Sequence, residues 1–150
     1  LSAGSGVGSL TIPANYLIAG KTIRVSIKGI YTTDAITPGT ITLRAKVAGS
    51  TVATSGSPTL PSGATGNSSF DIVYYITCRT TGVSGTAIIM GAAEYSGGVG
   101  LAENRLDINN GSTQFTLNTT TTNALDFSVQ FGTADSDNSY TSTIAIIESI

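Results

Sequence analysis

Apolar and polar residues alternate with a period of two along most of this chain, and this pattern constrains the fold more than any other feature. The clearest stretch is 23–28, in which Ile23, Val25 and Ile27 are separated by polar residues, as in a strand with one wet face. No stretch shows the 3.6-residue period of an amphipathic helix. The pattern predicts strands at 23–28, 41–47, 51–54, 69–79, 86–95, 106–108, 115–117, 125–131 and 141–150.

Turn residues separate these predicted strands. Gly49-Ser50 lies between two apolar runs at the spacing of a tight hairpin, and Asn110-Gly111, between 106–108 and 115–117, is the strongest hairpin signal in the chain. We therefore expect an all-β fold, an antiparallel β-sandwich of jelly-roll type with about eight to nine strands. Residues 10–150 are predicted to form this single domain, and the Gly- and Ser-rich residues 1–9 a flexible leader or linker.

Composition excludes several classes of function. The chain has 7 basic and 9 acidic residues and a net charge of −2, so it lacks the basic surface expected of a protein that binds nucleic acid. It contains no His and a single Cys, Cys78, which excludes an intrachain disulfide, a zinc finger and a His-dependent catalytic triad. We interpret Cys78 as a small buried hydrophobe. No apolar run reaches the length of a membrane span, so no membrane insertion is expected.

The outward faces and the edges of the predicted sheets must be covered or protected. Val73 and Tyr75 make the outward face of 69–79 unusually apolar for a surface that contacts water. Two interpretations are open: the face is covered, by another subunit or by the chain itself, or the two residues are scattered apolar residues on the surface. Sheet edges need protection from unwanted pairing. Either pairing with a neighbouring subunit or basic side chains would provide it, the basic candidates being Arg24, Lys28, Arg44 and Lys46.

Four segments carry a resemblance to a known family: SLTIPANYL (9–17), GKTIRV (20–25), TITLRAKV (40–47) and GSTVATSG (49–56). They resemble the opening strands and hairpin of a jelly-roll domain found in bacteriophage virion proteins, including tail-fibre, tail-spike and head-fibre tips. Beyond them, in 69–79 and 125–150, only the strand pattern agrees. The resemblance implies a homotrimeric virion protein on the particle surface that joins other virion proteins through its N-terminal side and displays loops to a host surface, with a host glycan as the expected ligand.

The same segments have a structural meaning that needs no family. Pro13 lacks a backbone donor and must end the strand that precedes it, Asn15 can close the turn that follows, and Gly20 permits a positive φ before the next strand. These three residues are expected to shape the fold and not to bind a ligand.

Acidic residues offer little that could support catalysis. Only Asp135 with Asp137 and, more loosely, Glu94 with Glu103 form close pairs of the kind that glycoside hydrolysis requires. The segment 135–139 resembles the first half of a calcium loop, but Tyr140 stands where that loop needs Gly, and its bidentate Glu is absent. We therefore predict a protein that is not an enzyme and has no cofactor or bound metal.

Glycan recognition needs aromatic rings to meet the apolar face of a sugar and polar groups to bind its hydroxyls. Three tyrosines lie in or beside predicted loops, with acidic, amide and basic residues near them in the sequence. The predicted loop site consists of Tyr31, Asp34, Tyr95, Asn104, Arg105, Asp135, Asn138 and Tyr140.

The resemblance and the residue patterns together leave three interpretations of function. The first is a non-enzymatic, trimeric fibre or spike tip for host attachment. The second is a capsid decoration or head structural protein that binds the virion lattice and no receptor. The third is a bacterial extracellular carbohydrate-binding module, which would bind glycan as a monomer.

Overall fold

A computed structural model describes residues 10–36, 38–60, 62, 68–96 and 103–150 of the 150-residue chain. These residues form ten antiparallel strands and no helix, which confirms the predicted all-β class. The leader predicted over residues 1–9 lies outside them. The strands are β1 (Thr11–Ile12), β2 (Thr22–Thr32), β3 (Ile41–Val47), β4 (Ser50–Thr54), β5 (Ser68–Thr80), β6 (Gly85–Ser96), β7 (Glu103–Asn109), β8 (Phe115–Leu117), β9 (Asn123–Phe131) and β10 (Ser139–Ser149).

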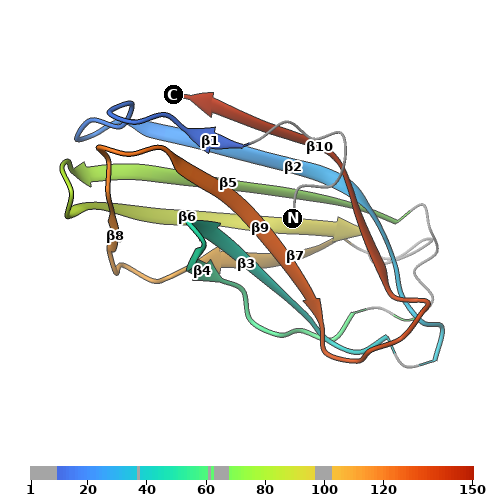
Figure 1. The fold of residues 1–150 in the computed structure, drawn as a ribbon. Helices are drawn as coiled ribbons and strands as arrows, with labels where there is room; N and C mark the ends of the chain where they lie inside the picture. The colour runs from blue at the N-terminus through green and yellow to red at the C-terminus, as the bar shows by residue number, and fades with distance from the viewer. Residues whose placement is uncertain (1–9, 37, 61, 63–67, 97–102) are drawn as a thin grey trace.

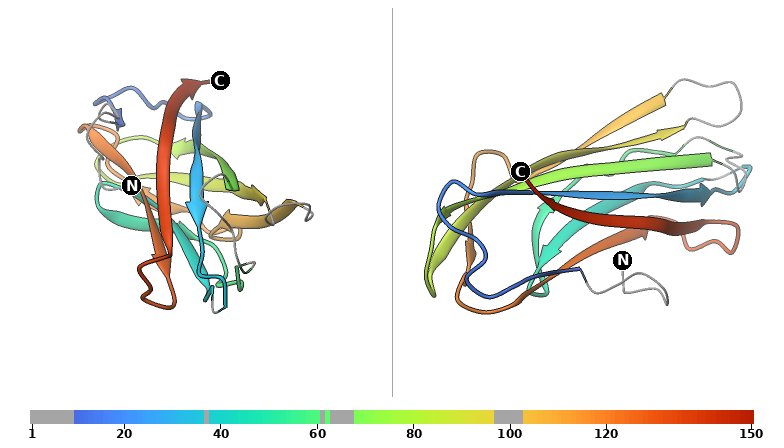
Figure 2. Two further views of the ribbon diagram at one scale, coloured as in Figure 1. Left: turned by 90° about the vertical axis from the view of Figure 1, so that its right-hand side faces the viewer. Right: turned by 90° about the horizontal axis from the view of Figure 1, so that it is seen from above.

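The strands follow the order β1-β9-β3-β4-β7-β6-β5-β2-β10, and β8 pairs with β6 outside this path. Between β4 and β7 the connection is reduced to one residue pair, Thr54 with Asn109, and there the sheet folds over. One layer contains β1, β9, β3 and β4, and it crosses in front of the longer layer of β7, β6, β5, β2 and β10 (Figure 1). The result is a curled antiparallel β-sandwich of jelly-roll type (Figure 2).

Alternate side chains of both layers fill the space between them. The inward residues of β3 and β5 are buried as their alternation predicts, and the side chain of Cys78 at the end of β5 is fully buried. Across the layers, the rings of Tyr74 (β5) and Phe127 (β9) stack with their centroids 6.3 Å apart. These buried side chains stabilise the fold, since burying one large apolar side chain contributes about 1.5–3 kcal/mol to the free energy of folding.

The predicted hairpin and the predicted turn after β1 are confirmed, but the hairpin turn lies one residue earlier than Gly49-Ser50, and Ser50 already belongs to β4. β3 and β4 form a hairpin in which Val47 faces Ser50, and the two residues between them, Ala48 and Gly49, have φ of 49° and 80°, as in a two-residue hairpin turn. After β1, Pro13 ends the strand and Asn15 adopts a φ of 60°, while Gly20 has the predicted positive φ of 86° before β2 begins.

The predicted Asn-Gly hairpin is wrong. β7 and β8 do not pair with each other, because both run antiparallel to β6, β7 along residues 90–96 and β8 along residues 85–87. β7 and β8 therefore run in the same direction along β6. The segment containing Gly111 connects them without reversing the chain.

The predicted protection of the edges is also corrected. Arg24 and Lys28 lie on β2, which is flanked by β5 and β10, and the two basic residues of β3 lie between β9 and β4. The outer strand of the longer layer is β10, whose sequence contains one charged residue, Glu148. Basic side chains therefore do not shield this edge.

The close contact between β5 and β6 provides a test of the core. Gly91 faces Tyr74, and a Cβ on Gly91 would lie 2.3 Å from the Cβ of Tyr74 and from the carbonyl oxygen of Val73. Gly91→Ala is expected to lower the free energy of unfolding by about 1–3 kcal/mol, measured by urea denaturation. The matched control is Gly56→Ala, whose Cβ would meet nothing within 4 Å. Equal unfolding midpoints for the two variants would contradict this packing.

Candidate functional site

The three tyrosines of the predicted loop site meet inside one end of the sandwich. Tyr31, Tyr95 and Tyr140 occur at the ends of β2, β6 and β10, where they line an apolar cavity of about 20 Å³. Tyr31 and Tyr95 make an edge-to-face contact with ring centroids 6.1 Å apart, and Tyr140 stacks on Phe70 at 3.9 Å. Tyr31 is 2% exposed, so the prediction that its ring forms part of a sugar platform is wrong.

The hydroxyl groups of these tyrosines differ in their partners. The Tyr31 hydroxyl donates a hydrogen bond to the backbone carbonyl of Ser96, whereas the buried Tyr140 hydroxyl has no partner among the described residues. Burial raises the pKa of Tyr31 to about 12, and burial also raises the pKa values of Tyr95 and Tyr140. All three are therefore neutral at neutral pH; Tyr31 belongs to the core, and Tyr95 and Tyr140 are partly buried against it.

Three other predicted residues lie together in two neighbouring loops. The side-chain oxygen of Asn138 accepts a hydrogen bond from the backbone N–H of Asp34 at 3.1 Å, which joins the loop after β9 to the segment after β2. Within the first loop, Asp135 accepts from the backbone N–H of Asp137 at 2.8 Å. The sequence placed Asp34, Asp135 and Asn138 in one site, and the structure brings them together.

The carboxylates of Asp34, Asp135 and Asp137 have oxygen atoms within 4.8 Å of one another. Two of them already act as acceptors for backbone groups, Asp34 for the N–H of Ile36 and Asp135 for that of Asp137. The carboxylates of Asp34 and Asp135 therefore stabilise the turns that hold them, as Asp does in many loops.

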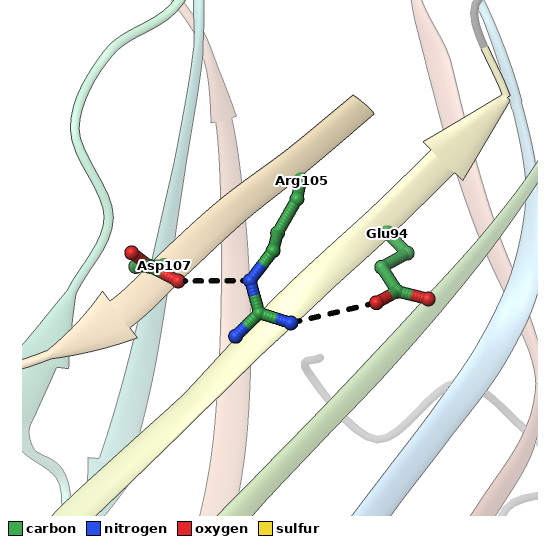
Figure 3. Close-up of polar contacts among 3 residues, drawn as sticks. All are labelled: Glu94, Arg105 and Asp107. Carbon is green, nitrogen blue, oxygen red and sulfur yellow. Dashed lines mark hydrogen bonds and ion pairs between the residues drawn. The ribbon is translucent and has the colours of Figure 1, made fainter. Parts of the chain in front are cut away.

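The last two predicted residues, Asn104 and Arg105, are exposed on β7. Asn104 faces Tyr95 across the ladder, whereas Arg105 faces Glu94 on the outer side of the sandwich. The guanidinium of Arg105 lies between two carboxylates, with Nη1 3.5 Å from Glu94 and Nε 3.2 Å from Asp107 (Figure 3). Arg105 therefore belongs to a different surface from the tyrosine cavity.

This outer surface is hollowed along β5 and β6. A hollow of about 430 Å³ lies over Val73 and Ala92 beside Tyr75, and a second of about 380 Å³ continues past Lys28 toward Ser96. The two hollows share Asp71 and Glu94, so we treat them as one feature, the outer groove. Its principal side chains are Arg24, Lys28, Asp71, Val73, Tyr75, Ala92, Glu94 and Arg105.

Ion pairs border the outer groove. Lys28 pairs with Asp71, and Arg24 pairs with Glu148 across the β2–β10 ladder at 3.4 Å. Two polar atoms of these pairs, Nε of Arg24 and Oδ1 of Asp71, are shielded from solvent and have no hydrogen-bond partner among the described residues. Such an atom costs about 1–3 kcal/mol unless a water or ligand satisfies it.

Sequence reasoning assigned one groove residue, Arg105, to the binding site. It also noted Val73 and Tyr75 as apolar residues on an outward face, and this was the available signal for the groove. The missing information was the register, which aligns Asp71 with Glu94 and Tyr75 with Met90 on neighbouring strands.

The thiol of Cys78 is not placed for chemistry. Its side chain is fully buried and its Sγ lies 3.4 Å from the carbonyl oxygen of Thr80. Burial raises the pKa of this thiol, which keeps it protonated at neutral pH.

No protein-family model, curated protein or solved structure matches this chain. Within the part of the chain that the structure describes, there is also no helix with the length and apolar character needed to cross a membrane.

The hydroxyl groups of Tyr31 and Tyr140 give a matched pair of tests. Tyr140→Phe is expected to raise the free energy of unfolding by about 1 kcal/mol, because it removes a buried hydroxyl without a partner. Tyr31→Phe is expected to lower it by about 1 kcal/mol, because it removes the hydrogen bond that the Tyr31 hydroxyl donates to the Ser96 carbonyl. Urea denaturation at pH 7 measures both effects, and a similar loss of stability in the two variants would contradict the assignment.

Proposed function

We propose that this chain is a non-enzymatic structural protein of a bacteriophage virion, the tip of a fibre or spike that attaches to a host surface as a homotrimer. The resemblance of residues 9–56 supports the virion assignment, and the jelly-roll-type sandwich is the fold that this resemblance leads one to expect. In this arrangement the N-terminal side joins the rest of the virion and the opposite surfaces meet the host, where a glycan is the ligand.

The open edge formed by β10 is the observation that carries this proposal. β10 is 11 residues long, and no strand among the described residues pairs with its outer backbone groups. Ile144 and Ile146 on it are 47% and 46% exposed, and Glu148 is its one charged residue. Soluble proteins usually block such an edge with charges or Pro, or cover it. A neighbouring copy of the chain would cover it here.

Trimer formation follows if β10 of one copy contacts a different surface of the next. Such a head-to-tail contact generates a closed ring when the rotation between copies is one third of a turn. In this proposal the contact between copies leaves the outer groove and the loop containing Asn138 accessible to a host ligand, although the second hollow of the groove reaches Thr143 of β10.

Solution mass tests the trimer. Light scattering after size exclusion is expected to give the mass of three chains of 15.2 kDa each. Ile146→Lys is expected to reduce this mass to one chain, since it places a charge on the edge. Val83→Lys, at an exposed residue of the β5–β6 turn, is the control and is expected to leave the mass unchanged. A monomeric wild-type protein would overturn the trimer.

Adsorption to cells tests attachment. Fluorescently labelled protein is expected to bind a subset of a panel of bacterial strains, and the extracted surface polysaccharide of a bound strain is expected to compete. The polysaccharide is expected to keep its length after prolonged incubation, because the protein is not an enzyme. Shortened polysaccharide would overturn the non-enzymatic assignment, and failure to bind any strain would favour the capsid decoration role.

A further inference from the structure

We propose that the outer groove, and not the loop site, binds the ligand, and that the ligand is a neutral oligosaccharide. This inference rests on the proposed attachment function and names its ligand class and location. The argument uses the shape of the groove, its exposed ring and its alternating charges.

The floor and one wall of the groove suit the apolar face of a sugar ring. Val73 and Ala92 face each other in the ladder and leave a low, apolar floor, while the ring of Tyr75 beside them is 42% exposed. An exposed aromatic side chain next to small apolar residues offers a flat contact at little entropic cost, because Tyr has only two χ angles. Sugar C–H groups can pack on such a surface.

The length of the groove favours a chain of sugars over a single ring. Tyr75 and Asp71 are four residues apart on β5, a separation of about 13 Å at the usual rise of a strand. The second hollow extends the groove beyond Asp71 toward Ser96. An extended ligand lying along β5 and β6 would therefore contact the ring at one end and polar side chains at the other.

The charges of the groove favour a neutral ligand with many hydroxyl groups. Arg24, Lys28 and Arg105 are each ion-paired with a carboxylate, so cations and anions alternate along the groove. An anionic ligand would meet Asp71 and Glu94, and a cationic one would meet the basic groups. A hydroxyl both donates and accepts, so ligand hydroxyls can accept from the exposed part of the Arg24 guanidinium and donate to the carboxylates of Asp71 and Glu94.

The first experiment uses an array of neutral and anionic oligosaccharides of two to six sugars, followed by calorimetric titration of the best neutral ligand. Wild-type protein is expected to prefer neutral oligosaccharides. Tyr75→Ala is expected to weaken the binding about tenfold or more, and Tyr75→Phe, which keeps the ring, to weaken it less than about threefold. The control is Tyr16→Ala, since Tyr16 is similarly exposed at 37% but lies in the turn after β1.

The outcomes separate this proposal from the attachment function. Preference for anionic saccharides, or equal binding by wild type and Tyr75→Ala, would overturn the groove as the ligand site. Cell adsorption that Tyr75→Ala leaves unchanged would overturn the groove while attachment stands. Array binding that depends on Tyr75, together with a monomeric mass and no adsorption to cells, would support the groove and overturn the virion function. A change of mass in Tyr75→Ala would identify the groove as a contact between copies and overturn the proposal.

Discussion

Packing between the two layers is the constraint on which the other features depend. Tyr74 and Phe127 stack across the interior, and Val25, Ile27 and Ile72 surround them from β2 and β5. Side chains of a strand alternate between faces, so burying these residues also fixes which residues point outward. A slip of one residue in β5 would expose Tyr74 and bury Tyr75 together with Asp71. The core therefore sets the composition of the outer groove, although no groove side chain contributes much to the core.

The strands themselves were predictable because their signal is local. The alternation in residues 41–47 and 115–117 matches β3 and β8, and the Gly49 hairpin needs only the two residues of its turn. Strand order was not predictable, because it depends on contacts between distant segments. Asn110-Gly111 has the sequence of a hairpin turn, yet β6 offers a partner to both flanking strands and thereby overrides that preference. For the same reason, the basic residues of β2 could not be recognised as belonging to an interior strand.

The candidate site was predictable only where short-range sequence determines it. Asp135 and Asn138 lie in one turn, which the local sequence indicates, whereas the hydrogen bond between Asn138 and Asp34 joins segments that are distant in the chain and could not be predicted from it. Tyr31 has the same parity as Ile27, so its burial was readable from the alternation. Tyr140 was not readable, because the bulge between Ser142 and Ile144 reverses the parity of β10 and turns Tyr140 and Ala145 toward the same interior.

The outer groove also carries features that stability alone does not explain. Arg105 is 63% exposed on its side chain, and exposed ion pairs of this kind contribute about 0–1 kcal/mol each, so the fold does not depend on them. A surface shaped only by solubility would place charged residues over the whole face of β5 and β6, whereas here Val73 and Ala92 form an apolar floor with charges at its border. Because the core fixes the register without these side chains, the fold does not dictate their identities, and under the proposed function these side chains serve recognition of the ligand.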